Sequence, residues 1–171
     1  MVNASPNAAA DFCAKAFVNP CRRGGLPARG KTLRGDGSGV QTRDVVADDR
    51  LISRLRLDPS RQLIGAQCSG ALVIARLGLL DGMPACTDMK SRPFVEACDV
   101  PVPDAPFHAE GNIATAGGCL ASQHLATWVI ARMLGEDAAR DVIGYVAPVG
   151  ENQETVDRAM RAVHSGEAAL R

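Results

Sequence analysis

The segment QLIGAQCSGALVIARLGLL places Cys68 between two differently patterned stretches. Residues 61–67 form a short apolar run typical of a buried strand, and residues 69–82 carry apolar side chains at helical spacing. Cys68 therefore lies at a predicted strand-to-helix turn. The small residues Ala66 and Gly70 lie two positions before and after it. This is the small-x-nucleophile-x-small pattern of a nucleophile elbow.

An elbow exposes its central side chain at the carboxyl end of a strand and at the N-terminus of a helix. The helix dipole and the first helical N–H groups favour a thiolate there, so we expect a lowered pKa for the Cys68 thiol. The thiolate is the nucleophilic form, and the backbone N–H of Ser69 would point toward an oxyanion. The alternative is that Cys68 is a small buried apolar residue, and the pattern alone favours neither.

Composition limits the classes of protein that the chain can belong to. It has 171 residues, of which 46% are hydrophobic, enough for one domain with its own core. With 19 basic and 19 acidic residues the formal net charge is +0, which does not suggest nucleic acid as a partner. No apolar run approaches the ~18 residues of a membrane span. No clean signal peptide starts the chain, so we expect a cytoplasmic protein without membrane association.

Six cysteines are present, and they show neither a CxxC pair nor the Cys/His spacing of a zinc site. We therefore expect no metal and no other cofactor. In a reducing compartment most of these residues would be free thiols.

Residues 1–36 differ from the rest of the chain. They show no helical or strand period, and we interpret them as an irregular segment that contributes no strand or helix. A basic arm that binds phosphate is the alternative interpretation. No acidic residue occurs between Asp11 and Asp36, and the basic residues there are Lys15, Arg22, Arg23, Arg29, Lys31 and Arg34.

Beyond this segment, short buried strands alternate with amphipathic helices. That order predicts an α/β fold with a parallel sheet and helices on both faces. The expected strands are 61–67 and 84–88, with extended segments around a turn at 110–112. The expected helices are 42–58, 69–82, 92–99, 119–135 and 137–147, followed by a helix-prone tail from 151.

Two separated motifs, AQCSGALVIARLGLLDGMPACTD and GNIATAGGCLASQHLATWVIARMLGEDAARDVIGYV, resemble the ThiJ/PfpI superfamily, the class I glutamine amidotransferase-like proteins. The resemblance covers roughly residues 37–150. It implies a flavodoxin-like α/β domain over residues 37–171, with a parallel sheet sandwiched by helices. It also implies a homodimer and a small-molecule substrate.

The resemblance assigns three features around the elbow. Cys68 matches the reactive cysteine. Gly37, Ser38 and Gly39 correspond to a glycine turn whose N–H groups help form the oxyanion site. Gly117 and Gly118 correspond to a glycine pair that lets a loop pass close to the cysteine.

The chain also departs from the family pattern. Its first strand–helix unit looks missing or replaced, and with it the Glu or Asp that tunes the cysteine. Histidines that assist the cysteine in some members are replaced by Ser69 and Asp88, which become the further catalytic candidates. His108 could approach a pocket, whereas His124 looks packed and His164 solvated, so no Cys–His pair is assigned.

Two other cysteines, Cys86 and Cys119, would lie near the elbow on the family fold. We interpret both as buried thiols, with pairing to Cys68 under oxidation as the alternative.

The favoured function is a small-molecule hydrolase, hydratase or glyoxalase-type activity. One alternative is a redox- or stress-sensing cysteine protein without turnover, and another is an inactive truncated paralogue. Related domains precede DNA-binding regions in some transcription factors, but no helix-turn-helix segment is visible here.

Overall fold

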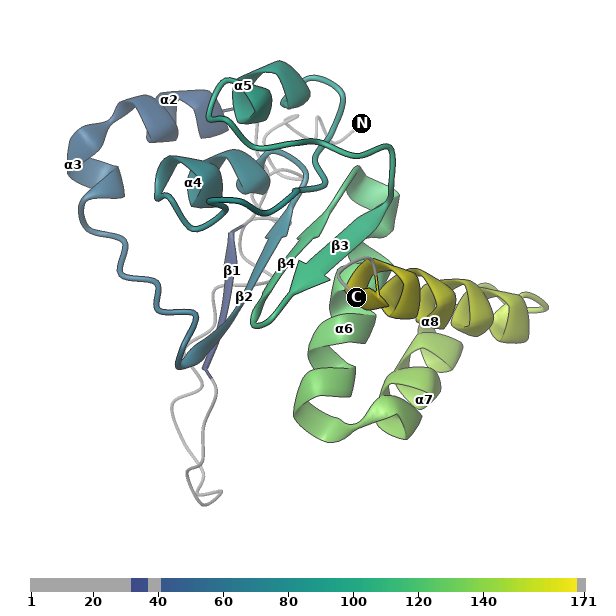
Figure 1. Ribbon diagram of the computed structural model, residues 1–171. Coiled ribbons are helices and arrows are strands. Elements are labelled where there is room, and N and C mark those ends of the chain that lie inside the picture. Colours follow the sequence, from purple (N-terminus) through teal and green to yellow (C-terminus); the bar gives the residue numbers. More distant parts are fainter. Residues whose placement is uncertain (1–31, 37–40, 169–171) are drawn as a thin grey trace, which may run out of the picture.

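The computed structural model describes residues 32–36 and 41–168. Its sheet has the strand order β1-β2-β4-β3 (Figure 1). Strands β1, β2 and β4 are parallel, and β3 runs antiparallel to β4. The expected parallel sheet is thus present, but its edge is a hairpin, closed by a turn in which Gly111 has a φ of 57°. The strands are β1 (Thr32–Asp36), β2 (Gln62–Gln67), β3 (Phe107–Glu110) and β4 (Ile113–Ala116).

Helices cover both faces of the sheet, as expected (Figure 1). Helix α4 packs on β1 and β2, and α2 and α5 pack against α4. On the other side, α6 packs on β2 and β4, and α8 packs on β3. The first group is α2 (Thr42–Ala47), α3 (Asp49–Ile52), α4 (Gly70–Arg76) and α5 (Arg92–Glu96). The second is the 3-10 helix η1 (Cys119–Ala121), α6 (Ser122–Leu134), α7 (Glu136–Val146) and α8 (Asn152–Ala168).

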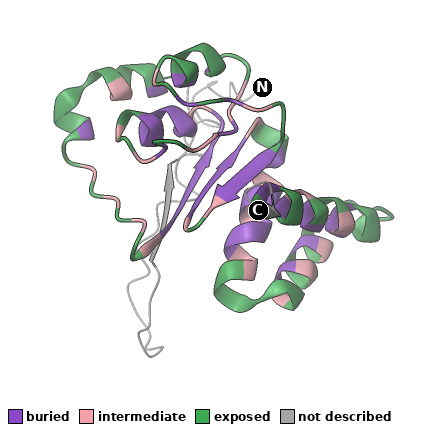
Figure 2. Cartoon of the chain, viewed as in Figure 1, coloured by how far each residue is buried: buried purple, intermediate pink, exposed green. Residues whose placement is uncertain are grey.

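Strand β2 lies at the centre of the core and is buried on both sides (Figure 2). Ile64 packs in the apolar cluster with α4, and Leu63 packs in the opposite cluster with α6. Gly65 lets α6 approach closely, because a Cβ there would lie 3.1 Å from Leu125 Cδ1. This two-sided burial explains why residues 62–67 read as an apolar run without alternation.

Several predicted elements differ from those observed. The helix expected over 42–58 is split into α2 and α3, because the Asp48 side chain accepts hydrogen bonds from Arg50 N and Leu51 N and so starts a new helix. The second part, α3, ends at Ile52. The helix expected over 69–82 ends at Arg76, shortly before Gly78 with its φ of 71°.

Residues 84–88, expected as a strand, are not one. Their backbone makes isolated bonds instead, from Ala85 N to Pro101 O and from Cys86 N to Thr115 Oγ1, both of 2.9 Å.

The expectation that residues 1–36 contribute no strand was wrong for the last five residues of that segment. Thr32–Asp36 forms β1 and pairs with β2 in parallel register, from Thr32 opposite Gln62 to Asp36 opposite Ala66. Backbone pairing with a strand about thirty residues away creates this element, and a local pattern does not reveal it. Residues 1–31 lie outside the described residues, so the irregular segment and the missing strand–helix unit stay predictions there.

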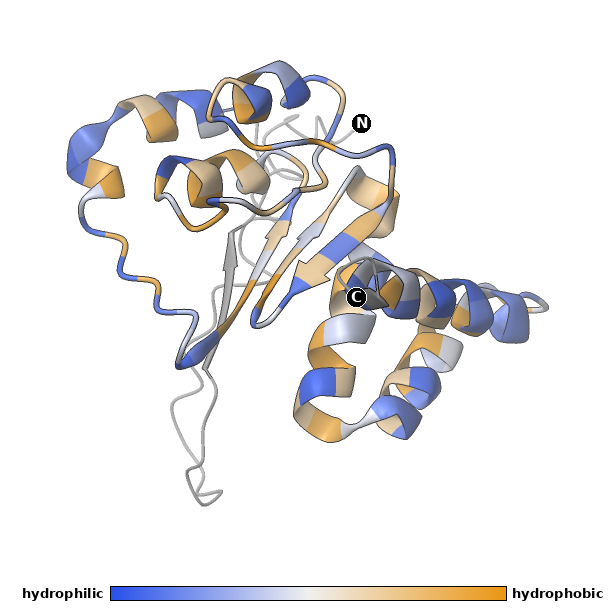
Figure 3. Ribbon diagram, viewed as in Figure 1, coloured by the Kyte–Doolittle hydropathy of each residue, from blue (hydrophilic) through white to orange (hydrophobic). Residues whose placement is uncertain are grey.

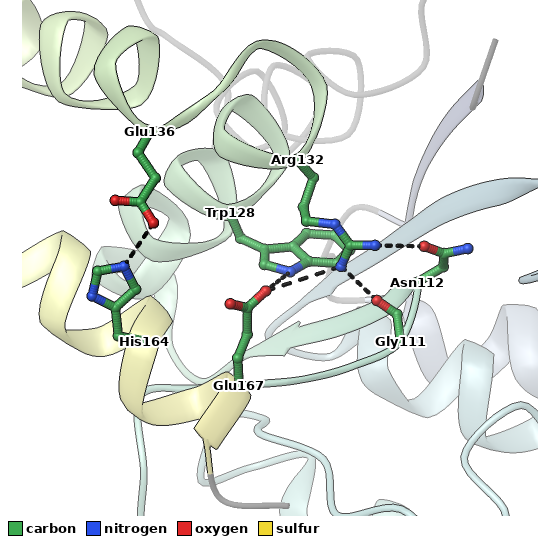
Figure 4. Close-up of polar contacts among 7 residues, drawn as sticks. All are labelled: Gly111, Asn112, Trp128, Arg132, Glu136, His164 and Glu167. Atoms are coloured by element: carbon green, nitrogen blue, oxygen red, sulfur yellow. Dashed lines mark hydrogen bonds and ion pairs between the residues drawn. The ribbon is translucent and has the colours of Figure 1, made fainter. Parts of the chain in front are cut away.

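Helix α8 packs directly on β3 and is also bonded to α6 (Figure 4). Trp128 Nε1 donates a 3.0 Å hydrogen bond to Glu167 Oε1. Arg132 stacks over the Trp128 ring at 5.5 Å and bonds to Gly111 O and Asn112 Oδ1 in the hairpin turn. None of the helices in the described ranges is long and apolar enough to cross a bilayer, and α8 itself is mainly hydrophilic (Figure 3).

Candidate active site

Cys68 forms the turn between β2 and α4. Its φ of 50° lies in the left-handed region, which is unfavourable for a residue with a side chain. Two hydrogen bonds hold it there: Cys68 N donates to Ala116 O at 2.9 Å, and Thr87 Oγ1 donates to Cys68 O at 2.8 Å. The strand-to-helix turn therefore carries a fixed, strained backbone at the cysteine.

The Cys68 thiol lies beside a second thiol. Its Sγ is 3.7 Å from Cys119 Sγ, although the two residues are far apart in the chain. Cys68 is only 4% exposed, whereas Cys119 is exposed at the start of η1. The buried carboxamide of Gln67 positions this loop, because its Nε2 donates a 2.8 Å hydrogen bond to Cys119 O.

Ser69 connects the elbow to the segment that follows the predicted glycine turn. Its hydroxyl lies 2.9 Å from the hydroxyl of Thr42, the buried first residue of α2. Thr42 comes shortly after Gly39 in the chain. The predicted oxyanion residues Gly37, Ser38 and Gly39 lie outside the described residues.

The glycine pair expected beside the cysteine is close to the elbow. Gly117 N donates a 2.9 Å hydrogen bond to Pro106 O, and a Cβ on Gly117 would lie 2.9 Å from Thr87 O. Only glycine fits there, next to the threonine whose hydroxyl holds Cys68 O. Gly118 has a φ of 82° and turns the chain toward Cys119.

Asp88, the other catalytic candidate that replaces a histidine of some family members, makes local bonds. Its Oδ1 accepts from Lys90 N at 2.9 Å and from Ser91 N at 3.1 Å. These bonds direct the carboxylate toward the turn that precedes α5.

Two of the three histidines are buried and the third is exposed. His108 on β3 and His124 on α6 are buried, and burial lowers the pKa of each imidazole. Glu110 partly opposes the shift at His108, whereas Arg158 adds to it at His124. His164 is exposed and lies 3.1 Å from a carboxylate oxygen of Glu136 (Figure 4).

Cys86 and Cys119, treated alike from the sequence, differ in the structure. Cys86 is fully buried, and burial raises its pKa to about 11, with a smaller opposing effect of Thr115. The expectation that both are buried thiols thus holds for Cys86 and was wrong for Cys119, which is exposed. The glycine turn at Gly118 directs the chain so that the Cys119 sulfur lies 3.7 Å from the Cys68 sulfur.

Sequence reasoning missed three residues of this site: Gln67, Thr42 and Thr87. Gln67 gave a weak signal, because a polar residue at the end of an apolar strand needs a hydrogen-bond partner when it is buried. Thr42 and Thr87 gave none, since their contacts come from distant parts of the chain. Within residues 32–36 and 41–168, no group of three or more His, Cys, Asp or Glu side chains could hold a metal ion.

A scan against protein-family models gives no match, and a search of the curated proteins gives none either. Solved structures do match. A ThiJ/PfpI family protein from Pseudomonas syringae gives a TM-score of 0.60 at 17% identity, covering 82% of this chain and 65% of that chain. A DJ-1 superfamily protein from Salmonella typhimurium gives 0.56 at 24% identity, covering 67% and 63%. The VC2308 protein gives 0.58 at 12% identity, covering 72% and 65%.

The chain thus has a ThiJ/PfpI-like fold, as its motifs predicted. It spans only 63% to 65% of the length of these structures.

Proposed function

We propose that the chain acts on a small molecule through Cys68 as nucleophile, in a hydrolase, hydratase or glyoxalase-type reaction. The observation that carries the proposal is the left-handed backbone of Cys68, with its φ of 50°, between β2 and α4. A strained residue persists only where its surroundings hold it, and such residues cluster at functional sites. The hydrogen bonds to Ala116 and Thr87 do this here.

In the proposed reaction the Cys68 thiolate attacks an electrophilic carbon of the substrate. The backbone N–H of Ser69 stabilises the oxyanion that forms, together with N–H groups of the Gly37–Gly39 turn. The bond between the Thr42 and Ser69 hydroxyls supports this arrangement, because it ties the chain just after that turn to the elbow. Asp88 is the proposed acid–base group, and this role requires its carboxylate to leave the turn that it caps.

The test is a substrate panel of α-oxoaldehydes, isocyanides and activated amides. Wild type is compared with Cys68→Ala and with the control Cys98→Ala, whose thiol contacts Phe94 O near the end of α5. We expect turnover in wild type and the control and background rates in Cys68→Ala. Equal turnover in all three would show that Cys68 is not the nucleophile.

A second candidate is a redox-responsive cysteine protein without turnover. The 3.7 Å approach of Cys119 Sγ to Cys68 Sγ favours it. Consumption of peroxide that stops once the thiols are used up, with no turnover in the substrate panel, would support this candidate over the enzyme. An inactive truncated chain would show neither turnover nor preferential oxidation of Cys68.

We also propose a homodimer in a reducing compartment such as the cytoplasm. Exposed apolar side chains on α7, among them Tyr145 and Val146, support an association surface. Sedimentation velocity over a range of concentrations tests the dimer.

A further inference from the structure

We propose that Cys119 is a resolving cysteine, which converts oxidised Cys68 into a reversible Cys68–Cys119 disulfide. The inference rests on the proposed function in one respect only: Cys68 must be reactive. It assigns to Cys119 a role outside catalysis, as the residue that protects the nucleophile and switches it off.

The geometry places the two sulfurs close to bonding distance. They are 3.7 Å apart, and a disulfide requires about 2.05 Å. Cys68 is fixed at the elbow by its bonds to Ala116 and Thr87. Cys119 is exposed and lies in the short 3-10 helix η1 directly after Gly118, so a small shift of this loop closes the remaining gap.

The other described cysteines are poorly placed for this step. Cys86 is fully buried with its pKa raised to about 11, so few of these thiols ionise near neutral pH. The Cys98 thiol lies 3.5 Å from Phe94 O, near the end of α5. Cys119 is therefore the described cysteine that combines exposure with contact to Cys68.

The reaction begins with a hydroperoxide as oxidant. The Cys68 thiolate attacks the outer peroxide oxygen, the O–O bond breaks, and the leaving alkoxide or hydroxide takes up a proton. Cys68 is now a sulfenic acid. The Cys119 thiolate then attacks Cys68 Sγ, the S–S bond forms, the S–O bond breaks, and the departing hydroxide becomes water. Two thiols are thereby oxidised and one peroxide is reduced.

The different exposure of the two cysteines also sets the direction of reduction. An external thiol attacks the sulfur of Cys119, the more exposed of the two residues, forms a mixed disulfide there and releases the buried Cys68 as thiolate. A second thiol then frees Cys119, so the external thiols leave as their own disulfide. The nucleophile returns without passing through sulfinic acid, which is irreversible in most proteins.

The experiment treats reduced wild type, Cys119→Ser and the control Cys98→Ser with hydrogen peroxide and then blocks the remaining thiols. Trypsin with a glutamate-specific protease gives residues 62–76 with Cys68 and residues 111–132 with Cys119, and separates both from Cys98. We expect these two peptides to be linked in wild type and in Cys98→Ser, and to separate after dithiothreitol. In Cys119→Ser, Cys68 should be recovered as sulfinic acid that dithiothreitol does not reduce.

The proposal is overturned if wild type and Cys119→Ser form sulfinic acid at Cys68 at the same rate without a linked peptide. It is also overturned if Cys68 links to another cysteine. Failure of the enzyme proposal looks different, since the linked peptide would then form in a chain without turnover. If turnover exists, peroxide should abolish it reversibly in wild type and irreversibly in Cys119→Ser.

Discussion

The side-chain amide of Gln67 donates a 2.8 Å hydrogen bond to the carbonyl oxygen of Cys119, which ties the end of β2 to the loop that faces Cys68. The same Nε2 lies 3.4 Å from Gly118 O. One buried side chain thus helps to hold the Cys119 loop beside Cys68.

Replacing Gln67 by leucine should loosen this loop. The variant keeps the apolar bulk but removes the donor, so we expect a loss of about 1–2 kcal/mol in the free energy of unfolding. Disulfide formation between Cys68 and Cys119 should slow at the same time. Urea denaturation and the linked-peptide assay measure the two effects.

Gln153→Leu is the matched control, because its carboxamide contacts only Asp157 in an exposed pair on α8 among the contacts that the structure describes. It should change stability by no more than about 0.5 kcal/mol. Equal effects of both substitutions would contradict the positioning role of Gln67.

Cys86 should resist alkylation in the folded protein. With a pKa of about 11, its thiolate fraction near pH 8.5 is roughly a hundredfold below that of an ordinary thiol, and the side chain is also buried. Iodoacetamide labelling followed by peptide mass spectrometry should find Cys119 modified early and Cys86 only after unfolding in urea. Early labelling of Cys86 in native protein would show that residues 84–88 open readily.

Gly117→Ala should displace the elbow. The new Cβ would meet the backbone oxygen of Thr87 at 2.9 Å, and a backbone atom cannot rotate away. We expect a cost of about 1–3 kcal/mol in the free energy of unfolding. Because Thr87 also holds Cys68 O, any Cys68-dependent turnover should fall as well.

Gly144→Ala provides the comparison for that variant. Gly144 lies within α7, and its Cβ would lie an ordinary 3.5 Å from Val156 Cγ2 of α8. Alanine is the better helix former, so this substitution should be neutral or stabilise by up to about 1 kcal/mol. A Gly117→Ala chain as stable as Gly144→Ala would argue against the close packing at Thr87.

Stability should depend on pH through the buried histidines. The folded-state pKa of His108 and of His124 lies below its usual value, so the unfolded chain takes up protons first as the pH falls. The free energy of unfolding should therefore be unaffected by these groups above about pH 7 and should decline below about pH 6.5. Urea titrations over this range measure the slope.

The contribution of a single histidine is isolated by His124→Leu, which should flatten this decline. His164→Gln replaces an exposed histidine and should leave the decline in place. Parallel slopes for wild type and His124→Leu would show that His124 is protonated equally in both states.

Some elements could be predicted from the sequence because their determinants are local. The residues 119–135 carry a helical apolar pattern closed by Gly135, and the structure has η1 and α6 there. Strand β1, with the sequence TLRGD, has no such pattern and exists through its pairing with β2. The helix predicted from continuous apolar periodicity is split at Asp48, because the Asp48 side chain caps the start of α3.

The candidate site shows the same limit. The position of Cys68 at a strand-to-helix turn followed from neighbouring residues, and the structure has that turn. The different environments of Cys86 and Cys119 could not be predicted. That Cys119 Sγ lies 3.7 Å from Cys68 Sγ is a tertiary contact, and the spacing of cysteines in the sequence does not indicate it. The supporting roles of Thr42 and Thr87 are likewise tertiary contacts.

The chain contains a single tryptophan, and Trp128 is fully buried with its indole N–H on Glu167 of α8. Its fluorescence therefore reports the attachment of one helix rather than an average over the molecule. Release of α8 would let water reach the indole and shift the emission to longer wavelength. A stopped-flow trace of this signal would time the docking of the C-terminal helix, without any added label.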